Sequence, residues 1–493
     1  MTPESDEAAF SVRREIWSLE QNETWDPITL AYATAIREMQ DRPFPADQTS
    51  YAYQTAMHGI DDDPGRGPDG VWNMCQHQSW YFLPWHRMYI LWFERIVRDI
   101  VRTQGGPSDW ALPYWNWQAN RALPPAFREE KLPASAGGRG NPLFIEDRIL
   151  VNNGIRLAPD VVLSAGAEAA VSFFGRAGQH PFGFGGGVID RPSHFGARAT
   201  GELERQPHNN VHRTIGGTMG TAGSPGDPIF WLHHAQIDRL WGRWLRLGGG
   251  RANPTEGAWL DQEFRFFKAR GADVTQTPRE VVSTEALGYR YDDDPPPVAV
   301  PLSALVPEQA EAMLAQIERA VVASASPEEL GASEPLRLGT GVTSTSIKPA
   351  DPSAMRLESL ATPDTSPSTV ALIVEGIRLG DPQAPIYEVY LNMADVGEGG
   401  HHHSPHFVGF LEFFGADHEH GEHAEHAEGS KRVFNVTSLV YQLQQEGRWD
   451  PARAVVSFVP ARVFEDPNTG ALLAPPIPRD PGVQIEAVRI VAE

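Results

Sequence analysis

The sequence predicts two differently built parts, a mainly α-helical first part and an all-β C-terminal part. The first ~290 residues hold 13 of the 14 tryptophans, and apolar residues recur there at three- and four-residue steps. After residue 332 the pattern changes to short alternating apolar runs separated by turn residues. The chain has 493 residues, more than one hydrophobic core usually spans, so two domains are expected.

Three segments of the first part have the pattern of helices. Residues 26–40 open with Asp-Pro, an N-cap followed by proline at the first helical position. Residues 86–102 and 227–245 repeat apolar residues at helical spacing, and the second of these also opens with Asp-Pro. Residues 103–205 are rich in glycine and proline, which predicts long loops over a helical scaffold.

The C-terminal part follows a change in composition. Residues 293–301 (DDPPPVAVP) predict an extended segment, and residues 307–324 predict one exposed helix. The alternating runs predict an all-β sandwich with strands at 369–377, 386–393, 406–414, 454–460 and 485–492. We therefore expect a helical domain over 1–293, a linker with one helix over 294–331, and a β domain over 332–493.

Charge and hydropathy exclude several classes of partner. The formal net charge is −23, which repels phosphate backbones and anionic lipid surfaces, so neither nucleic acid nor membrane is expected. No run approaches the roughly 20 apolar residues of a membrane helix. The first 20 residues contain no signal-peptide core, which favours a cytoplasmic location and leaves secretion on a partner's signal open.

The histidines of the first part suggest a metal site. His208 and His212 lie four residues apart, so both imidazoles fall on one face of a helix. One such pair is weak evidence, because it also occurs by chance. The wider set lies among tryptophan, phenylalanine and leucine, where several imidazoles need a reason to be buried. A shared metal supplies that reason, and the other members of the set are His58, His77, His86, His233 and His234.

The ligand type favours copper over other metals. Hydrolytic zinc sites usually combine histidine with a carboxylate or thiolate, and non-haem iron oxygenases use two histidines with one carboxylate. Groups of neutral imidazoles without a carboxylate suit copper.

Three stretches resemble a known family. CQHQSWYFLPWHRMYILWFE, PHNNVH and GDPIFWLHHAQIDRLW are similar to the two copper-binding segments of type 3 copper proteins, which are tyrosinases, catechol oxidases and haemocyanins. The resemblance covers residues ~10–293, to the Tyr289-Arg290-Tyr291 motif, and the later β region looks like the C-terminal domain of polyphenol oxidases. It implies a helical bundle with a dicopper site. One copper would be held by His58, His77 and His86, and the other by His208, His212 and His234, with His233 outside the ligand set.

The only cysteine stands two residues before one of these histidines. Fungal tyrosinases and molluscan haemocyanins carry a C-x-H motif in which the cysteine sulfur is bonded to a ring carbon of a copper-binding histidine. Cys75 and His77 have that spacing, so the resemblance implies a thioether between them. The alternative is a buried free thiol that packs as a small apolar group.

The same resemblance suggests which residues choose the reaction. Hydroxylation of a monophenol needs a proton acceptor near the metal. In tyrosinases a glutamate and an asparagine hold a water for this task, and Glu204 and Asn209 match those positions. Glu202 is a competing candidate for the glutamate.

Four further residues have less specific expectations. Phe230 could wall the substrate ring, and Arg213 and Ala222 match positions that line the entrance of bacterial tyrosinases, where alanine would leave the mouth open. Asp238 could orient an imidazole from outside the ligand set, or pair with Arg239 or Arg243 at the surface.

The resemblance therefore implies a tyrosinase that uses two copper ions and O₂ to hydroxylate small phenols and oxidise catechols to o-quinones. A catechol or o-aminophenol oxidase and a haemocyanin-like oxygen carrier are the alternatives. The C-terminal domain would act as a lid or latency domain, although no blocking residue is evident. The histidine-rich tract at 401–426 suits copper delivery and an acidic loop about equally, and nothing indicates an oligomeric state.

Overall fold

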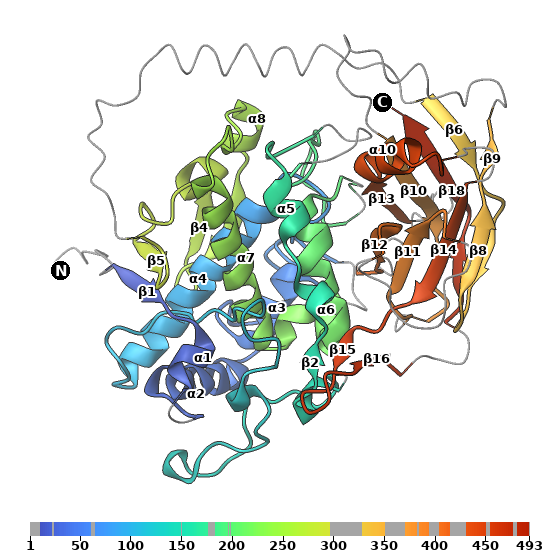
Figure 1. Ribbon diagram of the computed structural model, residues 1–493. Coiled ribbons are helices and arrows are strands. Elements are labelled where there is room, and N and C mark those ends of the chain that lie inside the picture. Colours follow the sequence, from blue (N-terminus) through green and yellow to red (C-terminus); the bar gives the residue numbers. More distant parts are fainter. Residues whose placement is uncertain are drawn as a thin grey trace.

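The computed structural model of the protein combines a helical body with a β-rich C-terminal domain (Figure 1). It describes residues 10–21, 24–60, 65–148, 150–175, 183–195, 197, 199–295, 328–350, 370–381, 384–393, 404–414, 430–449, 454–476 and 481–492. The predicted fold class is thereby confirmed. The predicted helix at 307–324 and most of the histidine-rich tract at 401–426 lie outside the described residues.

Three long helices form the centre of the helical body: α2 (Pro27–Asp41), α4 (Phe82–Thr103) and α7 (Ile229–Arg246). Helix α4 packs against both of the others and buries its whole first half among tryptophans. The shorter helices are α1 (Ile16–Leu19), α3 (Tyr51–His58), α5 (Ala165–Ala169), α6 (Asn209–Ile215) and α8 (Gly257–Leu260). Long loops connect them, as the composition of 103–205 predicts. The small strands of the helical body are β1 (Ser11–Arg13), β2 (Arg156–Leu157), β3 (Phe264–Phe267), β4 (Asp273–Gln276) and β5 (Tyr289–Tyr291).

Aspartates fix the starts of two of these helices. The Asp26 carboxylate accepts a hydrogen bond from the backbone N–H of Ile28 (2.8 Å), which is the predicted N-cap of α2. Asp227 caps α7 in the same way by accepting from Ile229 N–H (3.0 Å). The buried guanidinium of Arg148 holds Asp227 through both carboxylate oxygens (2.6 and 2.7 Å). The start of α7 is therefore anchored to the loop region, which matters because α7 carries two of the candidate histidines.

The C-terminal domain is a β sandwich. One antiparallel sheet has the strand order β13-β10-β18-β6-β9, and the other has the order β12-β11-β14-β8. Buried residues of both sheets, such as Leu372 and Val389, belong to one apolar cluster, so the two sheets enclose a common core. Strand bounds are β6 Glu328–Ala332, β8 Thr343–Ser346, β9 Lys348–Pro349, β10 Val370–Ile377, β11 Tyr387–Leu391, β12 Phe407–Leu411, β13 Ser430–Asn435, β14 Val455–Pro460 and β18 Ala487–Ala492.

The rest of this domain consists of short elements that the periodicity did not predict. Helix α10 (Thr437–Gln445) follows β13, and a two-stranded sheet pairs β7 (Leu336–Leu338) with β17 (Val483–Ile485). Across the described part of the chain, no helix has the length and apolar content needed to span a membrane.

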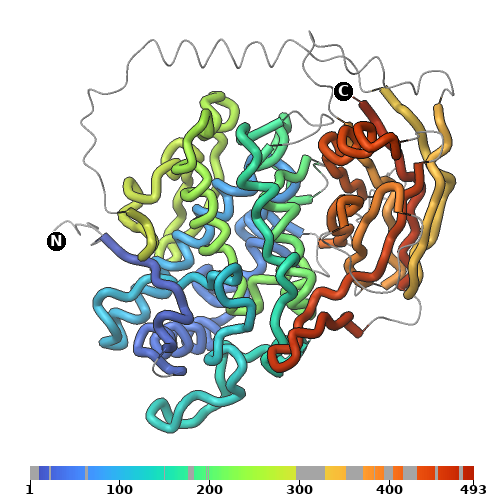
Figure 2. Tube along the Cα trace, viewed as in Figure 1, coloured from blue at the N-terminus to red at the C-terminus, as the bar shows by residue number. Residues whose placement is uncertain are grey.

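One C-terminal segment is part of a sheet with the helical body. Strand β15 (Phe464–Glu465) pairs antiparallel with β2 of the helical body and with β16 (Leu472–Leu473), so one three-stranded sheet joins the two domains. Figure 2 shows this red segment lying against the helical body before the chain returns to the sandwich. The Nη1 and Nη2 atoms of Arg121 donate to the two carboxylate oxygens of Glu465 (2.9 and 3.0 Å). Phe464 is fully buried. The domains are therefore joined by backbone pairing, a salt bridge and apolar burial.

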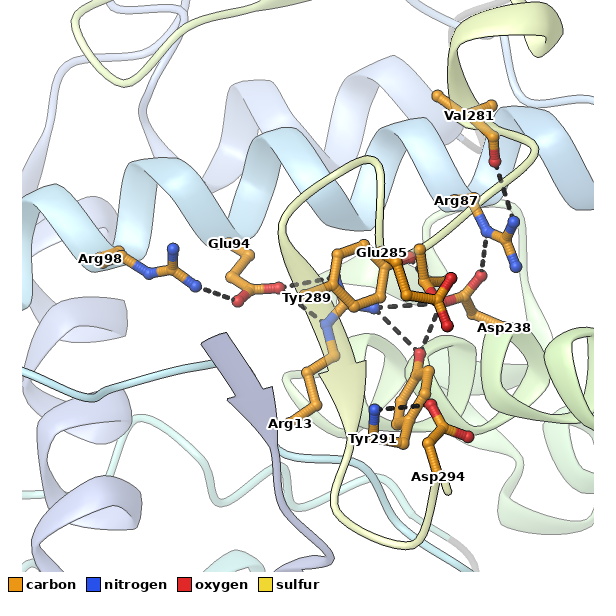
Figure 3. Close-up of polar contacts among 11 residues, drawn as sticks. Arg13, Arg87, Glu94, Arg98, Asp238, Val281, Glu285, Tyr289, Tyr291 and Asp294 are labelled. Atoms are coloured by element: carbon orange, nitrogen blue, oxygen red, sulfur yellow. Dashed lines mark hydrogen bonds and ion pairs between the residues drawn. The ribbon is translucent and has the colours of Figure 1, made fainter. Parts of the chain in front are cut away.

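A buried ion network ties the N-terminal strand to helices α4 and α7 (Figure 3). Asp238 accepts hydrogen bonds from Arg87, from Arg13 (3.2 Å) and from the hydroxyls of Tyr289 (2.8 Å) and Tyr291 (2.5 Å). This corrects both expectations for Asp238, because its carboxylate is bonded to Arg87, Arg13 and the two tyrosines. Burial alone would raise the pKa of Asp238, but Arg87 and Arg13 hold it below its usual value, so the carboxylate is charged.

We predict that Asp238→Asn lowers the free energy of unfolding by about 3–5 kcal/mol, because it leaves buried Arg87 without its anion and leaves buried Arg13 with Glu94 alone. Urea denaturation measures the change. The matched control is Asp261→Asn, which removes an exposed pair with Arg279 and should cost less than about 1 kcal/mol. Equal losses in the two variants would show that the buried network adds nothing special to stability.

Candidate metal centre

The first group of histidines converges from three segments. His58 ends α3, His77 lies in the loop before α4, and His86 lies on α4. Their Nδ1 atoms lie 2.7 Å from the carbonyl oxygen of Ala222, 3.1 Å from Cys75 Sγ and 2.8 Å from the carbonyl oxygen of Phe82, respectively. A carbonyl oxygen can only accept, so His58 and His86 carry their proton on Nδ1 and turn an unprotonated Nε2 inward.

The second group comes from the region around α6 and from α7. His208 ends a wide π-helical turn, η5 (Glu204–His208), and His212 and His234 lie on α6 and α7. His208 Nδ1 donates to Asn209 Oδ1 (2.8 Å), and His212 Nδ1 donates to the Met219 carbonyl oxygen (2.7 Å). Their Nε2 atoms approach Nε2 of His234 at 3.3 and 3.4 Å. The Nε2 atoms of His208, His212 and His234 therefore lie close together and face one another.

The two groups face one another. The rings of His86 and His234 stack at 4.4 Å with an interplanar angle of 10°, and the rings of His77 and His208 are 6.0 Å apart. Burial lowers the pKa of all six imidazoles, to about 3 for His86 and His212, so they are neutral. Neutral imidazole is the form that binds a metal.

The polar atoms at the centre fit two metal ions. Among the described residues, the Nε2 atoms of His58, His77 and His86 are buried and have no hydrogen-bond partner. In the second group, the Nε2 lone pairs of His208 and His212 both face His234 Nε2. A proton on His234 Nε2 could form a hydrogen bond with only one of them. Leaving these lone pairs without a proton or a cation is costly in a buried site. Both triads therefore have the donor set and geometry of a metal centre, and imidazole-only sets suit copper.

His233 also lies in this cluster, but its proton is on the wrong atom for a ligand. Its ring is 4.8 Å from His212 and 5.3 Å from His208. The indole N–H of Trp117 donates to His233 Nδ1 (3.1 Å), so the neutral ring carries its proton on Nε2. His234 has no such competing donor on its Nε2, which favours His234 as the third ligand.

Cys75 lies where the predicted cross-link would need it. Its sulfur is buried and lies 3.1 Å from Nδ1 of His77, and at the same distance from Nδ1 of His194. Burial, followed by the charge of Glu204, raises the pKa of the Cys75 thiol, so it is protonated. Sequence reasoning missed His194, because the loop that carries it has no regular spacing to the motif around Cys75. The thioether itself stays a prediction.

Glu202 and Glu204, the two candidate glutamates, differ in burial. Glu202 pairs with Arg205 (2.5 Å) near the surface. Glu204 is 1% exposed, and its carboxyl accepts from the backbone N–H of Gln78 (2.8 and 3.0 Å), next to His77. Burial raises the pKa of Glu204 to about 8, although the Gln78 hydrogen bond opposes the shift. Glu204 is thus a buried carboxyl, bonded to the backbone of the residue that follows His77.

The remaining predicted residues occupy different places. Phe230 packs against His234 (4.2 Å between ring centroids) and His58 (5.1 Å), so it lies against both triads. Ala222 is buried and is not at an open mouth, which corrects that expectation; its backbone carbonyl orients His58. Arg213 donates to the carbonyl oxygens of Gly220 (3.3 Å) and of Ala384 in the β domain (3.1 Å).

The residue that covers the centre comes from the β domain, just after β12. Phe414 is 2% exposed, and its ring lies 4.5 Å from His212, 5.6 Å from His77 and 5.7 Å from His208. The same turn brings in Glu412, which accepts from the side-chain amide of Asn209 (3.0 Å).

Arg432 and the backbone N–H of Phe414 also donate to Glu412 (3.0 and 2.7 Å), and they fix the turn. The sequence placed residues 406–414 in one strand, but β12 ends at Leu411. Two consecutive phenylalanines at the end of a strand were the available signal for a protruding turn.

The helical fold and the two facing histidine triads are compatible with the class of type 3 dinuclear metal proteins, and a β domain packs over the triads. A family model for the common central domain of tyrosinase matches residues 48–159 and 188–247. Models for the polyphenol oxidase middle domain and for a domain of unknown function (DUF7868) match residues 253–299 and 326–469. The chain belongs to the tyrosinase and polyphenol oxidase family.

Relatives support this membership. A tyrosinase of Hahella sp. (strain CCB-MM4) is 33% identical over 460 residues, which covers 87% of this chain and 92% of the relative. A chloroplastic polyphenol oxidase of Malus domestica is 29% identical over 384 residues, covering 71% of this chain and 60% of that protein. The solved structure of latent apple tyrosinase has the same fold, with a TM-score of 0.60, 22% identity, and coverage of 99% and 98%. The protein is therefore a phenol-oxidising oxidoreductase, and its family implies a type 3 dicopper centre with which both triads are compatible.

Proposed function

We propose that the protein is a tyrosinase, which hydroxylates monophenols at the ortho position and oxidises the resulting catechols to o-quinones. The observation that carries this proposal is the buried Glu204 carboxyl, bonded to the backbone of the residue that follows His77, with Asn209 next to ligand His208. A dedicated catechol oxidase could do without such a base. The Hahella relative bears the name tyrosinase, which agrees with the proposal.

The protein's own residues would divide the work as follows. The six histidines would hold two copper ions, and the copper pair, when bound, would supply the electron transfer between phenol and O₂. Glu204 takes the phenol proton, directly or through a water. Asn209 fixes the Nδ1 proton of His208, so that His208 Nε2 stays available as a ligand. Buried aromatic side chains such as Phe230 keep bulk water out.

Oxygen uptake by the copper-loaded protein tests the proposal. We expect consumption with both 4-methylphenol and 4-methylcatechol. Consumption with the catechol alone would replace the proposal by a catechol oxidase, and consumption with 2-aminophenol only would indicate an aminophenol oxidase. Reversible O₂ binding without turnover of any phenol would favour an oxygen carrier.

We further propose that the β domain keeps the enzyme latent. The ring of Phe414 lies over the histidines of both triads, where a phenol ring would have to enter. Glu412 meanwhile accepts a hydrogen bond from the side-chain amide of Asn209, one of the residues of the proposed site. A substrate can therefore reach the centre only after the turn at 412–414 has moved away.

Cutting the linker should not release this domain. We predict that a protease site placed within residues 296–327, once cleaved, gives two fragments that still co-elute in gel filtration, with oxygen uptake unchanged. The reason is the joint sheet of β2 and β15, with the Arg121–Glu465 pair and buried Phe464. Denaturing electrophoresis would verify that the cut is complete. Separation of the native fragments after cleavage alone would contradict the prediction.

We also propose the thioether between Cys75 and His77. Peptide mass mapping of the copper-loaded, oxygen-exposed protein should find the peptide that contains both residues lighter by two hydrogens. Cys75→Ser should remove the mass difference. An alkylatable thiol at Cys75 in the loaded protein would refute the cross-link.

A further inference from the structure

A cavity of about 700 Å³ lies at the surface of the helical body, where helix α1 meets two loops. Residues within 15–21, at and around α1, form one wall, and residues of the loops over 114–120 and 292–293 form the others. Exposed residues such as Gln21 and Asn120 belong to the lining, so the cavity is accessible to solvent. Its size falls within the range of pockets that bind small molecules. The described lining contains no histidine, so this cavity is distinct from the metal centre.

The lining of this cavity is acidic. Its charged side chains are four carboxylates and one guanidinium, from Glu15, Glu20, Asp292, Asp293 and Arg239. Arg239 pairs with Asp293 (2.8 Å). Asp292 accepts from neutral donors, which are the hydroxyl of Tyr114 (2.7 Å) and the backbone N–H of Glu15 (3.0 Å). The lining therefore carries an excess of negative charge, which attracts cations.

Glu20 is the residue of this lining that points to a ligand. Its side chain is buried, with 8% exposed, and one carboxyl oxygen accepts from the backbone N–H of Ala126 (3.4 Å). The other oxygen, Oε1, is buried and has no hydrogen-bond partner in the described structure. Arg128 acts on Glu20 through space and forms no hydrogen bond with Oε1. A buried acceptor without a donor is costly, and a cationic donor in the cavity would remove that cost.

We propose that this cavity binds a small organic ammonium ion, which places its charged group between Glu20 and Glu15 and its apolar body against Trp17. An ammonium group donates up to three hydrogen bonds, so it can bind acceptors that lie apart. A metal ion needs several donors at one point, and within the described ranges such groups occur only among the histidines. The indole ring of Trp17 suits a cation, because its face attracts positive charge.

Binding should be linked to a proton on Glu20. Burial raises the pKa of Glu20 to about 8; Glu15 and Asp26 raise it further, and Arg128 opposes the shift. The carboxyl is therefore mostly protonated at pH 7, whereas an alkylammonium stays charged well above pH 8. Because the cation favours the ionised carboxylate, it displaces the proton, and affinity rises as pH rises through the pKa. We expect binding to be about five- to tenfold tighter at pH 8.5 than at pH 7.

Calorimetry with the intact, copper-free protein tests the site without any catalysis, so the result does not depend on the proposed function. The probe is 2-phenylethylamine, and 2-phenylethanol is its neutral counterpart of similar shape. Salt at about 0.15 M screens the general attraction of a chain with net charge −23 for cations. We expect the amine to bind at least about tenfold more tightly than the alcohol, because the ion pair adds to the same apolar contact. Equal binding of the two would overturn the proposal.

The same titration in two buffers of different ionisation enthalpy counts the protons released. At pH 7 we expect about one proton per bound amine. Glu20→Gln should abolish this release and reduce the affinity for the amine to that for the alcohol. Glutamine resembles the protonated carboxyl, so the variant should fold, and thermal unfolding verifies it. Glu446→Gln, which removes an exposed carboxylate of the β domain, is the control and should preserve both. Amine binding that is unchanged in Glu20→Gln, or lost equally in both variants, would overturn the proposal.

Calcium chloride tests the alternative class of ligand. Since the carboxylates of the cavity do not converge as a metal site does, Ca²⁺ should not compete with the amine in calorimetry. Ca²⁺ binding that exceeds the affinity for the amine and disappears in Glu20→Gln would overturn the assignment of an organic cation and replace it by a metal site.

Discussion

Replacing Phe414 by alanine should raise oxygen uptake by the intact, copper-loaded protein on the order of 10- to 100-fold. The ring of Phe414 fills the approach to His77, His208 and His212 and is 2% exposed. Burial of a phenylalanine side chain stabilises the docked turn by about 1.5–3 kcal/mol, and each 1.4 kcal/mol is tenfold in a population. The variant therefore opens the centre without any cleavage. Initial rates with 4-methylcatechol measure the effect.

Phe407→Ala is the matched control for this experiment. Phe407 lies on the same strand, β12, and its ring packs against Tyr390 and Phe410. Its loss should leave the protein as latent as before. A rise of similar size in both variants would mean that general loosening of the β domain explains the effect. No rise with Phe414→Ala would contradict the assignment of Phe414 as the covering residue.

Glu204→Gln, made in the Phe414→Ala protein, should lower hydroxylation of 4-methylphenol about 100-fold or more. Glutamine keeps the shape of the side chain but cannot take a proton. Oxidation of 4-methylcatechol should fall far less, because no hydroxylation step is needed. The ratio of the two rates, measured by oxygen uptake, is the quantity to compare.

The pH profile gives a second readout of the same residue. Burial raises the pKa of Glu204 to about 8, so its carboxyl is mostly protonated at pH 7 and becomes a base above pH 8. Hydroxylation should therefore rise with pH through this range, and the rise should disappear in Glu204→Gln. Glu202→Gln is the control, because that carboxylate pairs with Arg205 near the surface. A loss of hydroxylation in Glu202→Gln alone would contradict the assignment.

Local patterns predicted much of the helical body. Asp26 caps α2 as expected, because an N-cap needs only its own side chain and the next turn. Helix α4 starts at Phe82, earlier than the predicted residue 86. The residues of the two histidine triads were named only through the resemblance to type 3 copper proteins, because spacing alone relates His208 to His212 but does not relate His58 to His77 and His86.

Contacts between distant segments were the part that could not be predicted. Phe414 reaches His212 and β15 reaches β2 across hundreds of residues, and no periodicity encodes such a pairing. Asp238 lies four residues after His234, a spacing at which its side chain could face that imidazole. Its carboxylate instead accepts hydrogen bonds from the guanidinium groups of Arg13 and Arg87. A buried charge goes to the strongest available partner, and that partner is visible only after folding.

If the two histidine triads hold two copper ions, phenol oxidation by this protein depends on both triads. The most direct test is oxygen uptake with 4-methylcatechol by the Phe414→Ala protein as copper is added in known amounts per chain. We predict that the rate rises to its maximum at two copper ions per chain, and that removal of either His86 or His212 abolishes it. Saturation at one copper ion, or full activity without copper, would contradict the claim.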